Sequence, residues 1–438
     1  MTPPRQGAAG PALLSPGEQP LRAVSARWGR PRLLPAVNRA GLAACSQDRP
    51  GLRLAQLANF LSPTSGGLRV VVEEIGAQRW GTGERLLVVP GPATLCRTDG
   101  ACRICSVAGP RLPGDGHDYH VLLRRRPVAA RLRAFAPDLV EVHDQTTLVW
   151  AARWARRARV PSVLFSHERL DLVLGEVPGV PGGPTERVAR RWSRRMTERF
   201  DAIVCHSDFA AEPFAGVECE TVHRIPLGVD LKLFTPRSWP PSCDARRPAR
   251  LVFVGRLQRE KAPHTALDVL EGLLSTGIAV ELLMIGSGPL GTGLRERARR
   301  SGLPVTFLGH LADRSAVAQA LALSDVALSP GPRETFGLGA LEAMACGTPV
   351  LVSDTGASRE LLAPHAGAAV GGTPEAVRTV HHWLTDQTEH RRARRAARSR
   401  AEQFSWERTL TSIGRLREEL IGSQALRGVS HRRFGRKR

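Results

Sequence analysis

The sequence predicts an α/β protein with two doubly wound domains, each holding a parallel sheet that helices cover on both faces. Short runs rich in Val, Leu and Ile, without an alternating polar face, recur along the chain and are separated by helical segments. A Pro-rich joint, TPRSWPPSCDARRPA at 235–249, interrupts this alternation. The chain has 438 residues, too many for one ordinary core, so we expect one domain on each side of the joint.

Regular structure in the first half begins near residue 52, where LRLAQLANFL reads as a strand. A Ser/Pro/Gly loop and the amphipathic helix LRVVVEEIGAQ follow it. Helical segments ending at a Pro then alternate with short apolar runs, as in RLRAFAPDLVEVHD. We expect further strands within 84–91, 139–143 and 162–166, and the segments 199–214 and 221–230 complete this half.

The second half repeats the pattern, with helices such as 262–277 and 293–302 between its strands. The last regular segment, FSWERTLTSIGRLREELI, has apolar residues at helical spacing and is expected to pack back on the first domain. Strands are expected within 250–257, 279–286, 305–310, 326–331, 349–354 and 367–371, and the apolar helix positions are Trp406, Leu410, Ile413, Leu416 and Leu420. The predicted units are a disordered extension (1–50), a first domain (51–234), the joint (235–249), a second domain (250–402), a helix (403–421) and a basic tail (422–438).

The charge of +21 is concentrated at the two ends of the chain. Residues 1–50 hold seven Arg and two acids, and residues 391–438 hold fifteen basic residues and four acids. A basic tail suits anionic lipid headgroups or nucleic acid, or is simply solvated. Only 5% of residues are aromatic, which leaves little for base stacking and makes a nucleic-acid partner the weaker interpretation. We expect a cytoplasmic protein, with a peripheral contact to the inner face of the membrane as the further option, because the chain has no apolar run of bilayer length.

The eight cysteines are scattered, which in an intracellular protein favours free thiols over a disulfide framework. Cys96, Cys102 and Cys105 cluster in LCRTDGACRICSV, with His117 and His120 downstream. A C-x2-C pair is half of a zinc site, but the chain has no second such pair and the segment reads as a loop bounded by Gly and Pro. We therefore expect neither a metal site nor a disulfide here.

Three loops at the expected carboxyl edges of the sheets are suited to bind an anion. SPTSGGLR places Gly66 and Gly67 between a strand and a helix, where bare backbone N–H groups are accessible. VGRLQREK places Arg256 and Lys261 five residues apart on one loop, as a clamp for a diphosphate. The third loop is PRETFGLGALEAMACG, which should start a helix near 335 or 336 and end it at 347.

Glu334 and Glu342 are two carboxylates in that third, otherwise apolar, segment. Glu334 is expected at or just before the helix N-terminus, with Glu342 roughly 12 Å further along the axis. Hydrogen-bond acceptors at that separation suit a ligand with hydroxyls at both ends and an anionic middle, such as a nucleotide sugar. The alternative is structural: Glu334 complements the helix dipole and Glu342 pairs with a nearby Arg.

Gly286, Gly288 and Gly291 form a G-x-G-x-x-G pattern in GSGPLGTG, which is the fingerprint of dinucleotide binding. The pattern follows the second strand of its domain instead of the first, and the next strand end, FLGHL, has no acid to hold a ribose. We therefore discount NAD(P), and the chain has no P-loop motif. No cofactor is expected; a nucleotide-diphosphate sugar is the expected co-substrate.

The motifs GRLQREK, GSGP, FLGHL and the E-x7-E element from Glu334 to Glu342 resemble those of glycosyltransferase family 4. That family contains retaining enzymes with two Rossmann-like domains facing a central cleft, the GT-B fold. In the first half, SPTSGG, VEVHDQTTL, FSHERLD and RIPLGVD are most similar to bacterial GDP-mannose-dependent α-mannosyltransferases. The resemblance covers about residues 52–421.

The resemblance implies roles for residues at matching positions. Glu342 would hold the donor ribose, Glu334 would lie beside the transferred sugar, and His167 matches the active-site histidine of the family. The alternative for His167 is a polar residue that caps a loop. The implied catalytic residues are His167, Glu334, Lys261 and Arg256, and the acceptor-side candidates are His143, Asp144 and Asp171. The implied donor-binding residues are Gly66, Gly67, Arg256, Lys261, Gly286, Gly288, His310, Glu334, Phe336, Gly337, Leu338 and Glu342.

The expected function is therefore retaining transfer of a hexosyl group, with mannose from GDP-mannose as the favoured donor, to a lipid or glycan acceptor. Two cations and a helix N-terminus would stabilise the departing diphosphate, so no metal is expected. A UDP-sugar-dependent transferase of the same family is the first alternative, and a non-hydrolysing sugar-nucleotide epimerase is the second. A basic nucleic-acid-binding protein is the alternative from another class.

Overall fold

The structure is a computed structural model that describes residues 51–61, 66–78, 83–111, 119–175, 182–215, 221–237 and 247–434. It contains one large sheet in each half of the described chain, and each sheet is wound outward in both directions from its first strand. The predicted α/β fold class with two doubly wound domains is confirmed. The extension expected at 1–50, part of the joint and the last four residues of the chain lie outside the described residues.

In the first half, β1 (Leu54–Leu57) pairs in parallel with β2 (Arg85–Gly91) and with β5 (Leu139–Val142). The strand order is β3-β4-β2-β1-β5-β6-β7-β8, and every neighbouring pair is parallel except β3 with β4. The other strands are β3 (Leu95–Asp99), β4 (Cys102–Ala108), β6 (Ser162–Ser166), β7 (Ala202–Cys205) and β8 (Val222–Arg224).

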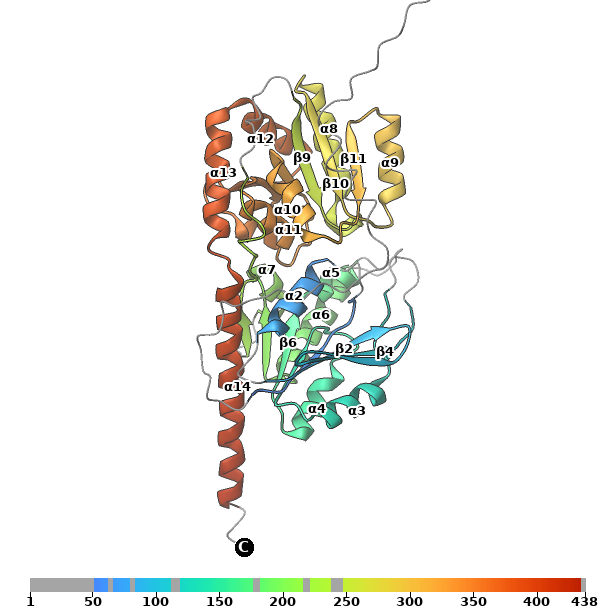
Figure 1. Ribbon diagram of the computed structural model, residues 1–438, viewed down its shortest axis with the longest axis vertical. Coiled ribbons are helices and arrows are strands. Elements are labelled where there is room, and N and C mark those ends of the chain that lie inside the picture. Colours follow the sequence, from blue (N-terminus) through green and yellow to red (C-terminus); the bar gives the residue numbers. More distant parts are fainter. Residues whose placement is uncertain are drawn as a thin grey trace, which may run out of the picture. The chain divides into compact units, whose positions relative to one another are not determined.

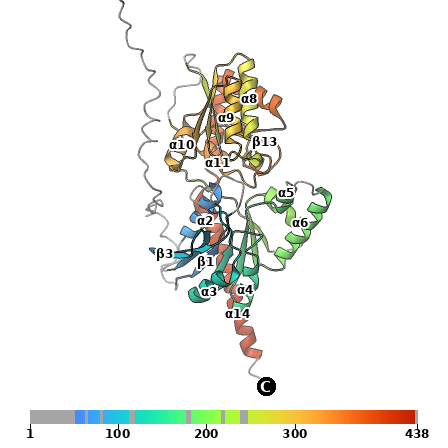
Figure 2. The same ribbon diagram turned by 90° about the vertical axis from the view of Figure 1, so that its right-hand side faces the viewer.

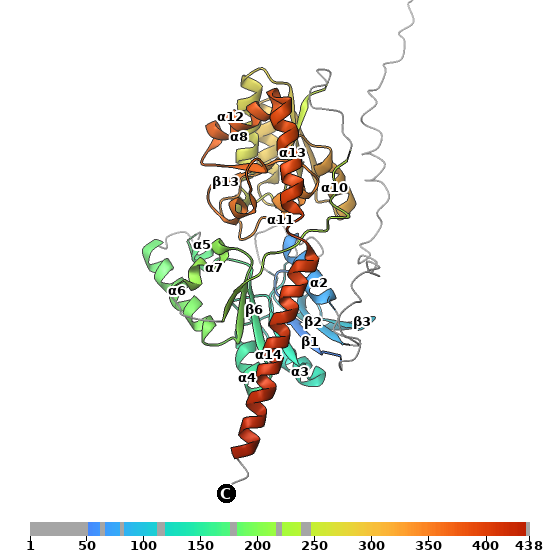
Figure 3. The same ribbon diagram turned by 90° about the vertical axis from the view of Figure 1, so that its left-hand side faces the viewer.

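The two faces of this sheet bury different residues because successive strand side chains point to opposite sides. One face, with Leu57 and Val142, packs against α3 (Arg125–Phe135), α4 (Trp150–Ala158) and α6 (Gly182–Thr197). The other face packs against α2 (Gly67–Ala77) and the C-terminal helix α14 (Trp406–Phe434), as Figures 1 and 3 show. The short helices are α5 (Leu170–Leu174), α7 (Asp208–Ala211) and η1 (Glu212–Phe214).

The second half has the strand order β11-β10-β9-β12-β13-β14, and all of its pairs are parallel. One face carries α8 and α9, which Figure 2 shows side by side, together with α12; α10, α11 and α13 cover the other face. The strands are β9 (Ala249–Val254), β10 (Val280–Ile285), β11 (Val305–Gly309), β12 (Val326–Ser329), β13 (Val350–Ser353) and β14 (Gly367–Val370). The helices are η2 (Arg259–Lys261), α8 (Pro263–Ser275), α9 (Gly291–Arg300), α10 (Arg314–Ala322), α11 (Leu338–Ala345), η3 (Ala357–Leu361), α12 (Thr373–Thr385) and α13 (Gln387–Ala401).

The C-terminal helix is longer than the sequence predicted. The expectation was a helix at 403–421 and a separate basic tail, whereas α14 continues through residue 434. The segment 404–434 contains no proline to end a helix. Trp406, Leu410, Ile413 and Leu416 are buried as their spacing predicted, because this stripe faces the first sheet.

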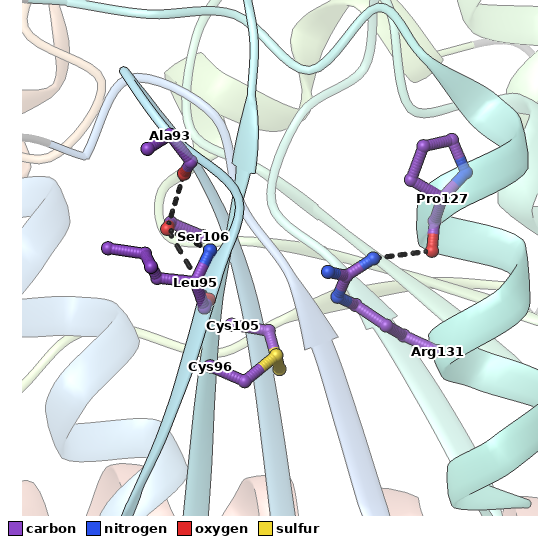
Figure 4. Close-up of a disulfide and its surroundings, with 7 residues drawn as sticks. All are labelled: Ala93, Leu95, Cys96, Cys105, Ser106, Pro127 and Arg131. Atoms are coloured by element: carbon purple, nitrogen blue, oxygen red, sulfur yellow. Dashed lines mark hydrogen bonds between the residues drawn. A yellow bond between two sulfur atoms is a disulfide. The ribbon is translucent and has the colours of Figure 1, made fainter.

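The cysteine-rich segment is a β-hairpin, so its prediction as a loop was wrong. Antiparallel strands β3 and β4 pair Cys96 with Cys105, and the two thiols form a disulfide, shown in Figure 4 with Arg131 of α3 nearby. The expectation of free thiols fails at this pair. All five residues of β3 are exposed, so the strand had no buried face to produce an apolar alternation.

Candidate active site

Several of the predicted site residues follow the strands at which the winding direction reverses. In the first sheet these neighbours are β1, followed by Gly66 and Gly67, and β5, followed by His143. In the second they are β9, which leads into Arg256 and Lys261, and β12, which leads into Glu334. Ligands of open α/β sheets bind beyond the carboxyl ends of strands at such reversals. The topology therefore places both sets of loops where ligand binding is expected.

Three histidines follow three adjacent strands of the first sheet: His143 after β5, His167 after β6 and His206 after β7. The Nδ1 atom of His143 lies 2.9 Å from Nε2 of His167. Ring centroids are 5.2 Å apart for His143 and His167, and 5.3 Å apart for His167 and His206. The three imidazoles thus form a stack, and His206 is a member that the sequence reasoning missed.

This histidine stack is neutral at neutral pH. Burial lowers the pKa of His143 and of His167 well below the ordinary imidazole value, and for His143 the positive charges of Arg85 and Arg417 act in the same direction. Burial lowers the pKa of His206 to about 4, although its hydrogen bond to the carbonyl of Ile225 opposes the shift. Neutral imidazoles can both donate and accept a proton in hydrogen bonds, whereas charged ones only donate.

The predicted diphosphate clamp is held by carboxylates. The Nζ atom of Lys261 lies 2.6 Å from Oε1 of Glu334, and the guanidinium of Arg256 pairs with Glu260. Arg256 also hydrogen-bonds Tyr119, a buried residue of the first half that the sequence reasoning did not select. The structure thus brings together Lys261 and Glu334, which are 73 residues apart in the chain.

Glu342 lies inside α11 and is buried, with 6% of its surface exposed. Arg314, the first residue of α10, donates to its Oε1 atom at 2.8 Å. Burial raises the pKa of the Glu342 carboxyl, and Arg314 offsets part of that rise. Pairing with a nearby Arg was the structural alternative for Glu342, and the structure identifies that Arg as Arg314.

The helix that carries Glu342 begins later than predicted. The sequence suggested a start near 335 or 336, but α11 begins at Leu338 after Gly337, whose φ of 91° is left-handed. A Cβ on Gly337 would lie 2.3 Å from Oγ of Ser358, so glycine is required there. Glu334 therefore lies in the loop before the helix, and the estimate of 12 Å along one helix axis does not apply.

The loop before α11 is tied to both halves of the described chain. Thr335 donates its hydroxyl to the carbonyl of His167 at 2.6 Å and accepts from Oγ of Ser207 at 2.7 Å. The amide of Ala357 donates to the carbonyl of Glu334 at 2.7 Å. Neither Thr335 nor Ser207 was selected from the sequence. Together these bonds attach the residue after Glu334 to the loops that carry His167 and His206.

The predicted donor-binding glycines fall into two groups. A Cβ on Gly67 would lie 3.5 Å from the Leu338 side chain, so the N-termini of α2 and α11 meet there, whereas Gly66 has open space around it. A Cβ on Gly286 or Gly288 would instead collide with the backbone of residues 255–257. These two glycines therefore shape the loop that carries Arg256.

Four other predicted residues have contacts that suggest more limited roles. The Phe336 side chain is buried against Phe404, so only its backbone remains for a ligand, while His310 is exposed after β11. The Asp144 carboxylate accepts from the backbone of its own loop at Thr146, Thr147 and Leu148, and also from Asn59. Asp171 is ion-paired with Arg169.

Within the described part of the chain, no group of three or more His, Cys, Asp or Glu side chains is arranged to hold a metal ion. Of the cysteine cluster weighed as a zinc site, Cys96 and Cys105 form the disulfide, and His117 lies outside the described residues. Among the described residues, none of the helices has the length and apolarity needed to cross a membrane.

The chain is similar in sequence to known sugar transferases over most of its length. It is 40% identical to the GDP-mannose-dependent alpha-(1-6)-phosphatidylinositol dimannoside mannosyltransferase of Mycobacterium tuberculosis (strain H37Ra), covering 83% of this chain and 95% of that one. It is 30% identical to a GDP-mannose-dependent alpha-mannosyltransferase of M. tuberculosis (strain CDC 1551), covering 72% and 82%. It is also 32% identical to the D-inositol 3-phosphate glycosyltransferase of Jonesia denitrificans, covering 62% and 70%.

The fold is similar to solved structures at low sequence identity. Sucrose-phosphate synthase from Thermosynechococcus elongatus has a TM-score of 0.67 at 21% identity, covering 85% of this chain and 100% of that one. HepE of Anabaena with UDP-glucose has a TM-score of 0.63 at 21% identity, covering 84% and 100%. Residues 65–233 match Glycosyltransferase Family 4, and residues 244–400 match Glycosyl transferases group 1. With the 40% identical relative spanning both halves, these matches show that the chain is a glycosyltransferase and belongs to family 4.

Proposed function

We propose that this glycosyltransferase moves mannose from GDP-mannose to a phosphatidylinositol mannoside, with retention of the anomeric configuration. The observation that carries the proposal is the 40% identity to a mannosyltransferase whose name states both that donor and phosphatidylinositol dimannoside as acceptor, over 95% of its length. A relative at 30% identity also has GDP-mannose in its name, whereas HepE, at 21% identity, supports the fold alone.

Arg256 and Lys261 bind the diphosphate of the donor. In the structure their charges are already neutralised by Glu260 and by Glu334, so phosphate oxygens enter a site that is built for anionic partners. When Lys261 pairs with the diphosphate, it releases the carboxylate of Glu334, which can then accept hydrogen bonds from the hydroxyls of the transferred sugar. Glu342 accepts hydrogen bonds from the ribose hydroxyls while it remains ion-paired with Arg314.

The reaction requires stabilisation of a departing nucleoside diphosphate and of an oxocarbenium-like sugar. Two cations and the N-terminus of α11 offset the charge that develops on the leaving group. They supply the stabilisation that a bound metal would otherwise provide, so the proposed reaction needs neither metal nor cofactor. Neutral His167 faces the sugar and contributes a hydrogen bond without adding a second positive charge.

A glycolipid acceptor places the enzyme at a membrane surface, and we extend the proposal to a peripheral contact with the cytoplasmic leaflet. Leu123 is 54% exposed, and the next three residues, Arg124, Arg125 and Arg126, are also exposed at the start of α3. An apolar side chain beside three guanidinium groups suits an anionic lipid surface. Co-sedimentation with phosphatidylinositol vesicles, but not with phosphatidylcholine vesicles, tests this contact.

The test of function is a transfer assay with purified protein, four donors and two acceptors. The donors are GDP-mannose, GDP-glucose, UDP-glucose and UDP-galactose; the acceptors are phosphatidylinositol dimannoside and inositol 3-phosphate, with products read by mass spectrometry. We expect one hexose to be added to the lipid from GDP-mannose, at the same rate in excess EDTA. Product from a UDP-sugar alone would overturn the donor assignment.

Glu334→Gln should abolish most of the transfer, with Glu407→Gln as the matched control because Glu407 is exposed in the first turn of α14.

A second acceptor is included because the relative from Jonesia denitrificans has D-inositol 3-phosphate in its name. Transfer to that small acceptor and not to the lipid would support the donor assignment and reject the glycolipid as acceptor.

A further inference from the structure

A buried ion pair connects the C-terminal helix to the first sheet. Nε of Arg417 lies 2.8 Å from Oε1 of Glu141, and the two side chains are 1% and 0% exposed. The remaining donors of Arg417 reach the carbonyl of Ile75 and Oε1 of Gln78, each at 3.2 Å. Burying such a pair is costly and often contributes little to stability. Its position next to the histidine stack suggests that it has another role.

Gln56 of β1 connects this ion pair to the histidines. Its Nε2 atom donates to Oε2 of Glu141 at 2.8 Å and lies 3.4 Å from Nε2 of His143. Its Oε1 atom accepts from Nε of Arg85 at 2.7 Å. The oxygen and nitrogen of a side-chain amide have nearly the same shape, so the orientation of the amide is decided by its hydrogen-bond partners. Here one side faces a group that only donates and the other a carboxylate that only accepts, so the charges of Arg85 and Glu141 allow one orientation.

The orientation of Gln56 fixes where the protons lie on the two neighbouring imidazoles. Because the Gln56 amide nitrogen can only donate, Nε2 of His143 accepts and the proton of His143 lies on Nδ1. That Nδ1–H then donates to Nε2 of His167, 2.9 Å away. His167 in turn carries its proton on Nδ1.

We propose that Gln56, oriented by Arg85 and by the Glu141–Arg417 pair, sets the tautomer of His167, which makes Arg417 of α14 a positioning residue for the active site. The chain of bonds runs from the last helix to the carboxyl end of β6 without entering solvent. It rests on the proposed function only in assigning His167 a place beside the sugar; the tautomer itself does not depend on which substrate is used.

The first test is nuclear magnetic resonance of the full chain labelled with ¹⁵N in histidine, because ring nitrogen shifts report the tautomer directly. His143→Gln and His167→Gln identify the two signals by their disappearance. We expect the Nδ1–H form at both residues in the wild-type protein. Gln56→Met keeps the size of the side chain and removes its donor, so the signals of His143 and His167 should move toward the Nε2–H form.

Arg417→Met tests the contribution of the helix, with Ile413→Ala as the matched control, since Ile413 is buried on the same helix outside the chain of bonds. Arg417→Met should shift the same two signals and lower kcat about tenfold to a hundredfold with little change in donor KM. Ile413→Ala should lower the melting temperature and leave both ring signals in place. Arg417→Lys should restore part of the wild-type spectrum.

Two results would overturn the inference: an Nε2–H signal for His167 in the wild-type protein, or ring signals that Gln56→Met leaves unchanged. Should Arg417→Met fail to fold, Gln56→Met alone decides, because it removes no charge. A shift of the ring signals in a protein that transfers no mannose would reject the proposed function and uphold the inference.

Discussion

The hydroxyl of Thr335 donates to the main-chain carbonyl of His167 at 2.6 Å, although the two residues are 168 positions apart. One follows β12 of the second sheet, and the other follows β6 of the first. Ser207 donates to the carbonyl of the same threonine. The residue next to Glu334 is thus attached to the strand end that carries the active-site histidine.

Removing this hydroxyl should loosen the site more than it destabilises the protein. We expect Thr335→Val to lower the free energy of unfolding by about 1 kcal/mol, as for one hydrogen bond. We expect kcat/KM to fall about tenfold or more because the loop that carries Glu334 is no longer fixed in position relative to His167. Thr411→Val is the control, since Thr411 is exposed on α14 and bonds only within its helix. Equal kcat/KM in both variants would reject the positioning role.

Lys261→Met should reduce turnover by removing leaving-group stabilisation and should leave the Glu334 carboxylate without its cation. We expect kcat to fall about a hundredfold or more, with Lys261→Arg recovering part of the loss. Lys232→Met is a matched control because Lys232 is one of only three lysines in the chain and is exposed. Steady-state kinetics at saturating donor provide the measurement. A Lys261→Met enzyme with wild-type kcat would exclude this residue from stabilising the leaving group.

Glu342→Gln separates a ligand role from a structural one. The amide keeps the volume of the side chain and one acceptor for Arg314, so the fold should persist. If Glu342 binds the ribose, the dissociation constant for GDP should rise about tenfold, measured by isothermal titration calorimetry, because charge-assisted hydrogen bonds to the hydroxyls are lost. A lower melting temperature with unchanged GDP affinity would leave Glu342 as a partner of Arg314 only.

The buried histidines predict a stability that declines in acid. Because burial lowers the pKa of His206 to about 4, the unfolded chain binds a proton at this residue before the folded one does. The contribution of neutral His206 to the free energy of unfolding is complete above roughly pH 6.5 and is lost as the pH falls toward 4. For one histidine the free energy of unfolding changes by at most about 1.4 kcal/mol per pH unit. His206→Asn keeps a donor for the carbonyl of Ile225 and should reduce the slope of unfolding free energy against pH. Identical slopes in urea titrations of the two proteins would refute the assignment.

The arrangement of the candidate site followed from the sequence because a parallel sheet brings the carboxyl ends of its strands together. Alternating apolar runs located β9 and β12, and that alternation predicted Lys261 and Glu334 on loops at the carboxyl edge of one sheet; the structure adds that the two strands are neighbours. His143 and His167 were likewise predictable as residues that directly follow adjacent strands. Each of these inferences needed only the order of the elements.

Contacts that depend on packing between distant segments could not be predicted in the same way. Arg314 was one arginine among many, and only the placement of α10 beside α11 selects it as the partner of Glu342. His206 follows a strand just as His167 does, but the resemblance to a family drew attention to one and not to the other. The hairpin of β3 and β4 left no periodic signal because all of β3 is exposed.

The pairing of Arg417 with Glu141 also has a consequence for synthesis of the protein. The two residues are 276 positions apart, so the carboxylate of Glu141 leaves the ribosome long before its partner. Before Arg417 is made, the buried carboxylate of Glu141 has its hydrogen bond from Gln56 but no cation to pair with, so the core of the nascent first domain is incomplete until residue 417 has been synthesised. A chain that stops before residue 417 therefore lacks the cation that pairs with Glu141 in the core of the first domain.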